Sequence, residues 1–225
     1  MPVPFDEAYA ATYDTQFAKL APLRDALHLV TRLALEDLRE DAHILSVGAG
    51  TGAEILHLAG IHPSWSFTAV DTSAPMLDRC RARVAAEGVG DRVHFHVGDV
   101  HSLSPEAGPF HGATAILVSQ FVIVPTARQQ FFQGIADRLA LGAPLVFAEL
   151  AMAPTDNELR EIWQRAQVLA CGPVAGSASA AESAAKMVSI VPPDEIERLV
   201  QTAGFSAPAH VFQTLMIHGW TARRR

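Results

Sequence analysis

The stretch HILSVGAGTGAEILHLA at residues 43–59 decides the fold. It reads as a short apolar strand, a turn with Gly48, Gly50 and Gly52 at alternate positions, and then a helix. Glycines allow a tight strand-to-helix turn and let a ligand approach the backbone, whose N–H groups would lie at the positive end of the helix dipole. An ordinary βα turn that happens to contain glycines is the alternative. The spacing of the three glycines after a strand favours a cofactor-binding turn.

The rest of the chain alternates between strand-like and helix-like stretches. Before residue 42, leucines recur at spacings of three and four, which predicts a helical prefix. From residue 43 onward, short apolar runs alternate with amphipathic stretches, as in strands connected by crossover helices. The predicted strands are 43–47, 66–70, 93–97, 113–118 and 144–149, with helices beginning near Thr51, Ala74 and Thr126 and another over 156–169. The final apolar runs, 206–212 and 215–222, predict an antiparallel hairpin.

These elements predict an α/β fold with a seven-stranded, mostly parallel sheet, helices on both faces and a C-terminal antiparallel hairpin. The 225 residues are enough for one full hydrophobic core, and no repeat is visible. We therefore expect a single domain over 1–225. Residues 1–41 would form a helical cap on it, and residues 155–190, which include a Gly-, Ala- and Ser-rich run, would form a lid-like insert.

The composition favours a small-molecule partner. The chain has 17 Lys+Arg against 24 Asp+Glu, and Lys19 and Lys186 are its only lysines, which argues against a nucleic-acid partner. Its longest apolar run, 113–124, is shorter than the roughly 20 residues that span a membrane. Asp6 and Glu7 stand where a secretory signal would carry positive charge. We expect a cytoplasmic protein that does not act on membranes; the sequence leaves its oligomeric state open, with a homodimer as one alternative.

Two acidic residues follow neighbouring predicted strands. Asp71 ends the second strand, 19 residues after Gly52, and a carboxylate there suits the hydroxyls of a ribose. Asp99 follows the third strand, within RVHFHVGDV. GAGTGA also fits the dinucleotide pattern if Ala53 is its last member, so a nicotinamide-dependent oxidoreductase is an alternative. It is disfavoured because such an enzyme has no standing need for Asp99 and because the chain contains no Tyr-x-x-x-Lys.

Four motifs together carry a resemblance to a known family. VGAGTG, AVDTSAPML, RVHFHVGD and ATAILVSQFVIV occur in the order and spacing of the class I S-adenosylmethionine-dependent methyltransferases, over roughly residues 40–150. The resemblance implies a Rossmann-like fold, S-adenosylmethionine as methyl donor and S-adenosylhomocysteine as product. It assigns contacts with this cofactor to Tyr13, Gly48, Ala49, Gly50, Thr51, Gly52, Asp71, Thr72, Met76, Gly98, Asp99, Val100, Ser119 and Gln120.

The resemblance also implies a role for each part of this set. The glycine turn would hold the methionine portion, Asp71 the ribose, Met76 the adenine and Asp99 its amino group. Asp71 as a helix cap and Met76 as ordinary core are the alternatives. The later half, through FQTLMIHGWTARR, loosely resembles the carboxy-S-adenosylmethionine synthase group, but the basic residue that holds a carboxylated substrate there has no confident match here. We therefore predict ordinary methyl transfer.

Methyl transfer from a sulfonium is an in-line displacement that needs alignment and exclusion of water more than acid–base groups. Where the acceptor must lose a proton, His101 and Glu149 are the candidate catalytic bases, because they follow strand ends. No metal site is predicted, since His94 and His96 lack a third ligand. The acceptor is expected to be a small, rather apolar molecule, with Trp163, Met152 and Met187 near it. A non-catalytic relative that binds S-adenosylmethionine is a further alternative.

Overall fold

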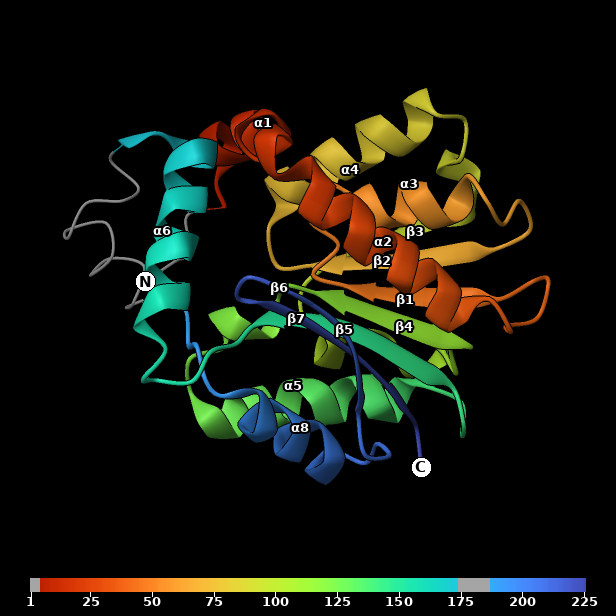
Figure 1. Ribbon diagram of the computed structural model, residues 1–225. Coiled ribbons are helices and arrows are strands. Elements are labelled where there is room, and N and C mark those ends of the chain that lie inside the picture. Colours follow the sequence, from red (N-terminus) through yellow and green to blue (C-terminus); the bar gives the residue numbers. More distant parts are fainter. Residues whose placement is uncertain (1–4, 174–186) are drawn as a thin grey trace.

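A seven-stranded sheet between two layers of helices forms the body of the protein in a computed structural model, which describes residues 5–173 and 187–225 (Figure 1). The strands are β1 (His43–Val47), β2 (Ser66–Asp71), β3 (Val93–Val97), β4 (Gly112–Ile116), β5 (Pro144–Leu150), β6 (Ala209–Thr214) and β7 (Ile217–Arg223). The α-helices are α1 (Glu7–Gln16), α2 (Ala21–Leu35), α3 (Ala53–Ala59), α4 (Ala74–Ala86), α5 (Pro125–Arg138), α6 (Asn157–Cys171) and α8 (Pro193–Thr202). Short 3₁₀ turns include η1 (Ala18–Leu20), η3 (Val100–Ser102) and η5 (Ser119–Phe121).

The order of the strands confirms the predicted fold class. The sheet runs β3-β2-β1-β4-β5-β7-β6, with β1 to β5 parallel and β7 antiparallel to both β5 and β6. The strands β1, β2 and β3 are added in one direction across the sheet. The next strand, β4, lies on the other side of β1, and β5 continues in that opposite direction. In open parallel sheets, ligands bind at the carboxyl ends of the strands where this reversal occurs. The expected ligand site therefore lies beyond the ends of β1 and β4.

The strands of the predicted hairpin are shifted by up to three residues, to 209–214 and 217–223, and two further elements differ from the sequence prediction. β4 ends at Ile116 rather than at residue 118, because Leu117 adopts a left-handed conformation with φ of 59° that a strand cannot continue through. Helix α8 was not predicted. Its start has two prolines followed by Asp194 and Glu195, residue types that favour the first turn of a helix, and its buried residues are Ile196 and Val200.

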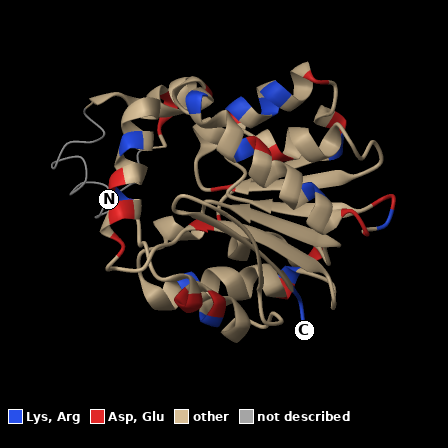
Figure 2. Cartoon of the chain, viewed as in Figure 1, with Lys and Arg blue, Asp and Glu red and all other residues tan. Residues whose placement is uncertain are grey.

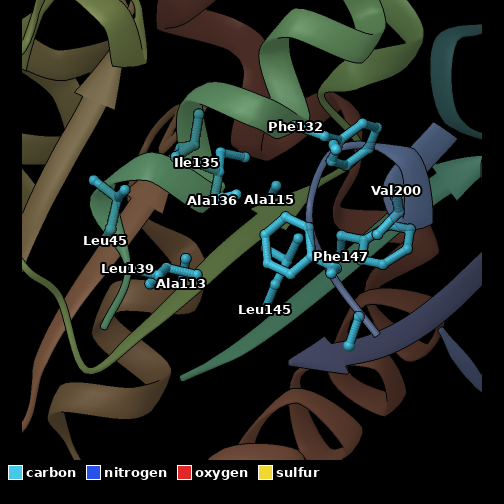
Figure 3. Close-up of a cluster of buried hydrophobic side chains, with 14 of the residues drawn as sticks. Leu45, Ala113, Ala115, Phe132, Ile135, Ala136, Leu139, Leu145, Phe147 and Val200 are labelled. Atoms are coloured by element: carbon cyan, nitrogen blue, oxygen red, sulfur yellow. The ribbon is translucent and has the colours of Figure 1, made fainter. Parts of the chain in front are cut away.

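Each face of the sheet has its own apolar core. On one face, side chains of the central strands pack against α5 and α8, with Phe132, Phe147 and Val200 completely buried (Figure 3). On the other face, Ile44 and Leu77 belong to a cluster beneath α3 and α4. Successive β1 residues thus point to opposite cores, which is the pattern expected for a strand buried on both faces. This packing holds the carboxyl ends of the strands in fixed positions.

Charged residues lie mainly on helices and loops, while the strand ribbons are almost entirely uncharged (Figure 2). Two exceptions are acidic: Asp71 ends β2, and Glu149 lies near the end of β5. Negative charge is therefore placed at the edge of the sheet where the ligand site is expected. No helix within the described residues is long and apolar enough to cross a membrane.

The helical prefix is present as α1, η1 and α2, before β1. Of the expected insert over 155–190, the structure describes α6 and the segment after residue 186. Residues 174–186, the Gly-, Ala- and Ser-rich part of that insert, lie outside the described residues.

Candidate functional site

The glycine turn after β1 is tied to the end of β2. Gly48, Gly50 and Gly52 have φ values of 67°, 53° and 78°, a left-handed conformation that glycine adopts without strain. The N–H groups of Gly48 and Ala49 donate to the Val70 carbonyl at 2.7 and 3.0 Å. The turn is thus fixed to the neighbouring strand by its own backbone.

Two of the glycines are also required by their surroundings. A methyl group on Gly52 would lie 2.4 Å from the Cys80 sulfur, and one on Gly48 would collide with Val118. A methyl group on Gly50 would meet only the Met76 Cε atom, at 3.5 Å. The backbone at Gly50 is therefore the most approachable part of the turn.

Asp71 joins the glycine turn to the start of α4. Its Oδ2 accepts from the Gly50 N–H and its Oδ1 from the Ser73 N–H, both at 2.9 Å. Burial raises the pKa of this carboxyl, and the hydrogen bonds from Ser73, Gly50 and Thr72 oppose that effect. Each carboxylate oxygen keeps a second lone pair, so Asp71 can accept further hydrogen bonds. Thr72 beside it is exposed, and Met76 is buried in the first turn of α4.

Asp99 lies at the end of the adjacent strand. The Gly98 N–H donates to the Asp71 carbonyl at 2.9 Å, which joins the two strand ends. Asp99 is exposed, and its Oδ1 caps η3 by accepting from the N–H groups of His101 and Ser102 at 3.0 and 2.9 Å. The Val100 side chain is buried in the α5 core, so that it faces away from this edge.

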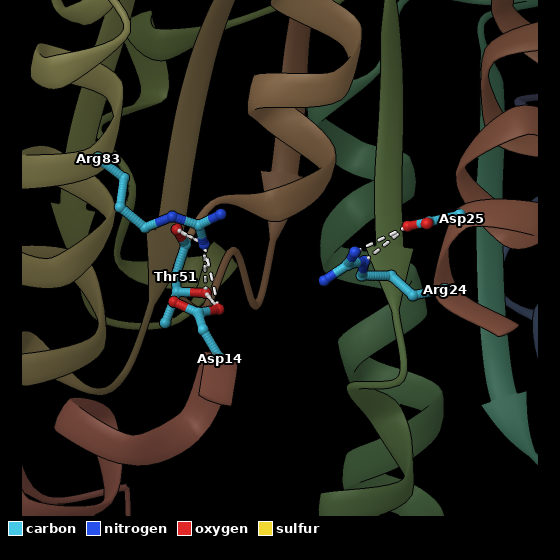
Figure 4. A network of polar contacts seen from close by, with 5 residues as sticks. All are labelled: Asp14, Arg24, Asp25, Thr51 and Arg83. Carbon is cyan, nitrogen blue, oxygen red and sulfur yellow. Dashed lines mark hydrogen bonds and ion pairs between the residues drawn. The ribbon is translucent and has the colours of Figure 1, made fainter. Parts of the chain in front are cut away.

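Helix α1 covers the glycine turn. Asp14 Oδ1 accepts from the Thr51 hydroxyl at 2.8 Å and from Arg83 Nη1 at 3.2 Å (Figure 4). Arg83 also donates to the Thr51 carbonyl and hydroxyl, each at 2.9 Å. The same helix brings in Tyr13, whose pKa is raised by burial and by the charges of Glu54, Asp14 and Asp71 among others. The Tyr13 phenol is therefore neutral and lies close to the turn.

Phe5, which precedes α1, contacts both the start of α4 and Phe121 of η5. The Ser73 hydroxyl donates to the Phe5 carbonyl at 2.5 Å, and the Phe5 ring packs edge-on against Phe121, with centroids 5.2 Å apart. Along α1, the rings of Phe5, Tyr9, Tyr13 and Phe17 follow one another at centroid separations between 5.1 and 5.7 Å. A stripe of aromatic side chains, Phe5 to Phe17 with Phe121, thus lies beside the glycine turn.

Ser119, Gln120 and Glu149 form a buried structural network instead of pointing into open space. The Glu149 carboxylate accepts from the N–H groups of Ser119 and Gln120 at 3.1 and 2.9 Å and pairs with Arg128 at 3.2 Å. Both charged side chains are almost inaccessible, at 0% for Glu149 and 2% for Arg128. The Ser119 hydroxyl accepts from Arg128, and the Gln120 amide oxygen accepts from the Leu150 N–H. These contacts fix the backbone of η5 at the site but occupy the side chains.

His101 lies on the α5 side of the sheet. Its ring is close enough to Gly134 that a methyl group there would come within 2.6 Å of it. It lines a surface cavity of about 430 Å³ with Asp137, Arg138 and neighbouring residues. A second surface cavity, of about 460 Å³, is lined by His43, which begins β1 and so lies at the opposite end of the strand from the glycine turn. Among the described residues, no three His, Cys, Asp or Glu side chains are grouped to hold a metal ion.

The residues at the glycine turn fit S-adenosylmethionine. Glycine at position 50 leaves the backbone approachable, Asp71 retains acceptor capacity for ribose hydroxyls, and Asp99 Oδ2 has no hydrogen-bond partner within the described part of the chain. The acidic groups Asp14, Glu54 and Asp71 near the turn suit a ligand that carries positive charge. Sequence reasoning missed Asp14, Glu54 and Arg83. The one available signal was that Asp14 adjoins Tyr13 and that Glu54 directly follows the glycine motif.

The chain is similar to known methyltransferases and related proteins. Residues 44–142 match a family described as a methyltransferase domain. The carboxy-S-adenosyl-L-methionine synthase of Campylobacter curvus is 27% identical over 146 residues, which are 64% of this chain and 60% of that protein. The protein of the same name from Campylobacter hominis is 25% identical over 218 residues, 93% of this chain and 89% of that one. The release factor glutamine methyltransferase of Chlorobaculum tepidum is 36% identical over 129 residues, 53% and 42% of the two chains. The matches thus span less than two thirds of the Campylobacter curvus and Chlorobaculum proteins.

Solved structures share the fold. A putative O-methyltransferase from Nostoc punctiforme superimposes with a TM-score of 0.70 at 15% identity, over 97% of this chain and 59% of that one. Human N-acetylserotonin methyltransferase, in complex with S-adenosylmethionine, superimposes with a TM-score of 0.62 at 14% identity, over 99% and 60% of the two chains. The domain match over residues 44–142, these relatives and the strand order together support a class I S-adenosylmethionine-dependent methyltransferase domain in this chain.

Proposed function

We propose that this protein transfers a methyl group from S-adenosylmethionine to a small, rather apolar acceptor by in-line displacement. One observation carries the proposal: Asp71, at the end of β2, accepts hydrogen bonds from the Gly50 and Ser73 N–H groups and keeps acceptor capacity beside the approachable backbone of Gly50. When bound, S-adenosylmethionine supplies a methyl group already activated by its sulfonium. The protein then needs mainly to align the reactants and exclude water.

The charges at the turn favour this donor over a nicotinamide dinucleotide. Asp14 hydrogen-bonds Thr51 within the turn, and Glu54 follows it in the first turn of α3. A pyrophosphate approaching the same backbone would be repelled by these carboxylates, and Arg83, the cation in contact with Thr51, is already paired with Asp14. A cationic sulfonium is attracted instead. We therefore do not favour the oxidoreductase alternative.

The cofactor contacts expected from the sequence are kept as part of the proposal. The turn of Gly48, Ala49, Gly50, Thr51 and Gly52 would hold the methionine portion, as the sequence resemblance implies. Asp71 and Thr72 would hold the ribose, Met76 would lie against the adenine, and Gly98, Asp99 and the Val100 backbone would border the adenine amino group. Tyr13 would close the site from α1. Ser119 and Gln120 would contribute through their backbone, since their side chains are engaged with Arg128 and Leu150.

The contacts of both candidate bases, Glu149 and His101, disfavour a role in proton transfer. Glu149 has its carboxylate paired with Arg128 and bound by two N–H groups, which disfavours proton transfer to an acceptor. His101 lies against α5, away from the glycine turn. Their catalytic roles stay predictions that these contacts disfavour. We propose that an acceptor with little need of a base, or one that loses its proton to water, is methylated here.

The acceptor side is proposed to be the aromatic stripe. The rings of Phe5, Tyr9, Tyr13 and Phe17, with Phe121, would give a small apolar acceptor an aromatic surface next to the donor. Residues 1–41 would act as the cap and 155–190 as the lid of a single domain. Met152 and Trp163, expected near the acceptor, belong to an apolar cluster between α2, α6 and the sheet, and Met187 is half-buried.

Calorimetry tests the proposal without knowledge of the acceptor. The wild-type protein is expected to bind S-adenosylmethionine and S-adenosylhomocysteine, and Asp71→Asn to weaken both by about 10- to 100-fold, because hydrogen bonds to a charged group contribute about 1.5–3 kcal/mol. Asp78→Asn is the control, since Asp78 is exposed on α4 and pairs there with Arg81. Absence of heat with both ligands, or tighter binding of NAD, would overturn the proposal.

A second candidate function follows from the relatives. The Campylobacter hominis protein, named carboxy-S-adenosyl-L-methionine synthase, aligns with 93% of this chain. Mass spectrometry of small molecules that copurify with the protein separates the two candidates. S-adenosylhomocysteine with a methylated compound supports methyl transfer, and a carboxylated S-adenosylmethionine supports the synthase. S-adenosylmethionine alone, with no turnover of any acceptor, would favour a non-catalytic relative.

A further inference from the structure

A chain of hydrogen bonds runs from β3 to the turn that contains Asp99. The Ser102 hydroxyl on η3 lies 2.7 Å from the Asp99 carbonyl oxygen and 2.8 Å from Nε2 of His96, which is near the end of β3. The Ser102 N–H also donates to Asp99 Oδ1 at 2.9 Å. Ser102 thus binds both the backbone and the side chain of Asp99, and His96 binds Ser102.

The number of hydrogen atoms fixes the direction of these bonds. A hydroxyl has one hydrogen and a carbonyl oxygen has none, so the Ser102 hydroxyl must donate to the Asp99 carbonyl. The Ser102 oxygen is then the acceptor in its contact with His96, and the hydrogen in that contact belongs to Nε2. The geometry therefore requires the Nε2–H form of the His96 ring.

Gly98 makes room for this contact. A methyl group at position 98 would lie 2.4 Å from the Ser102 Oγ atom and 2.9 Å from His96 Nε2. The two polar atoms thus meet in the space that the side chain of any other residue at this position would fill. The glycine before Asp99 is required by the bond between His96 and Ser102.

His94 shows that a histidine on this strand is not sufficient for the contact. It lies two residues before His96, on the same side of β3, and both border the surface cavity that His43 lines. The exposed His94 ring lies beside the ring of His43, with centroids 6.2 Å apart, at the far end of the strand from η3. Only the position at the end of β3 reaches Ser102.

Asp99 keeps one carboxylate oxygen for a ligand. Its Oδ1 accepts from the N–H groups of His101 and Ser102, whereas Oδ2 has no hydrogen-bond partner within the described part of the chain. Asp99 is exposed, so packing does not fix its side chain. A hydrogen bond weakens steeply when donor and acceptor are misaligned. The position of Oδ2 therefore depends on the bonds that hold the turn.

We propose that His96 and Ser102 are positioning residues that hold the Asp99 turn so that Oδ2 distinguishes a purine amino group from a purine carbonyl oxygen. The inference rests on the proposed function, in which Asp99 borders the adenine amino group. A carboxylate accepts a hydrogen bond from an amino group and repels a carbonyl oxygen, which is also an acceptor. His96 acts on the ligand only through the Ser102 hydroxyl.

The test compares S-adenosylhomocysteine with S-inosylhomocysteine, in which an oxygen replaces the amino group. By calorimetry, His96→Leu is expected to weaken S-adenosylhomocysteine by about 3- to 10-fold, the size of one lost hydrogen bond, and S-inosylhomocysteine by less than about twofold. His96→Gln, whose side-chain amide can still donate to Ser102, should recover most of the affinity. His94→Leu is the matched control and should leave both affinities unchanged.

Ser102→Ala tests the route of the effect. It should cause the same selective loss as His96→Leu, and the double variant should lose no more than Ser102→Ala alone, because His96 acts through the hydroxyl. A long-range ¹H–¹⁵N NMR spectrum of the ligand-free protein at pH 8 gives a second measurement that needs no ligand. The His96 ring, identified by its absence from the spectrum of His96→Gln, should carry its hydrogen on Nε2.

Five results would overturn the inference. They are a hydrogen on Nδ1 of His96, equal affinity of the wild-type protein for the two ligands, an equal loss of both in His96→Leu, the same loss in His94→Leu, and additive losses in the double variant. If His96→Leu does not fold, as judged by its thermal melt, Ser102→Ala and the wild-type NMR spectrum decide. If the wild-type protein binds neither ligand, the proposed function fails; if it prefers S-adenosylhomocysteine and the variants keep that preference, only this inference fails.

Discussion

Gly48 at the end of β1 lies directly against Val118, which follows β4. A methyl group at position 48 would come within 2.3 Å of Val118 Cγ2 and 2.6 Å of its Cγ1. The two residues follow the neighbouring parallel strands β1 and β4, between which the order of strand addition reverses. Val118 is brought there because Leu117 takes a left-handed conformation, with φ of 59°. The close approach of the two strand ends thus depends on a glycine on one side and a strained residue on the other.

We predict that Gly48→Ala lowers the free energy of unfolding by about 2–4 kcal/mol, as the sum of left-handed backbone strain and overpacking against Val118. Urea denaturation measures this change. Gly142→Ala is the matched control, since Gly142 has φ of 77° and open space around it, so that only the backbone strain of about 1–2 kcal/mol remains. Equal losses in the two variants would show that Val118 yields to the methyl group at no cost.

Asp14→Ala is predicted to speed the release of S-adenosylhomocysteine by about 2- to 10-fold, because it removes the contacts that hold α1 on Thr51 and Arg83. Stopped-flow displacement measures this rate. Asp14 is about one third exposed, so its removal should cost less than about 1 kcal/mol of stability.

Asp25→Ala is the control for Asp14. Asp25 pairs with the adjacent Arg24 on α2, without contact to the glycine turn (Figure 4). An unchanged release rate in Asp14→Ala, or the same acceleration in Asp25→Ala, would mean that α1 does not limit release.

Arg128→Met is predicted to destabilise the protein by about 3–5 kcal/mol, because it leaves Glu149 buried without its cation. The double variant Arg128→Met/Glu149→Gln should recover part of that loss, since no unpaired charge remains and an amide oxygen at position 149 can still accept from the backbone N–H groups of η5. Chemical denaturation of the single and double variants measures both. The prediction is contradicted if the double variant is as unstable as Arg128→Met alone.

We predict that stability falls as the pH is lowered from 7 to 5. Burial lowers the pKa of His28 from its ordinary 6.5 to about 4, and does the same for His218 with the help of His210. Between pH 6.5 and 4 the unfolded chain therefore binds more protons than the folded one. The contribution of each neutral histidine to the free energy of unfolding is complete above pH 6.5 and is lost as the pH falls. At pH 5 the loss is about 2 kcal/mol for each group at most.

Urea denaturation at pH 7.5 and pH 5 checks this dependence. His28→Phe and His218→Phe should each reduce the difference between the free energies of unfolding at the two pH values. His94→Phe, at an exposed position of β3, should leave this difference unchanged. A wild-type protein whose stability is the same at both values would contradict the prediction.

The local elements could be predicted from the sequence because their signals are local. β1, β3 and the start of α4 lie where the apolar runs and the Ser73–Pro75 signal put them. Asp71 and Asp99 could be singled out because each directly follows a strand, and the carboxyl ends of parallel strands share one edge. The premature end of β4 could not be predicted, because Leu117 adopts a conformation that leucine does not favour by itself.

The sequence by itself determined the α/β class, the glycine turn and the acids at two strand ends, since periodicity and glycine chemistry act over a few residues. Only the tertiary structure decided how distant side chains are paired. It placed Asp14 on Thr51, locked Glu149 with Arg128, turned His101 toward α5 and left Glu54 buried with Ser46 alone. These pairings depend on which elements pack together across tens of residues, and the energy of a charge depends on the partners and burial that packing gives it.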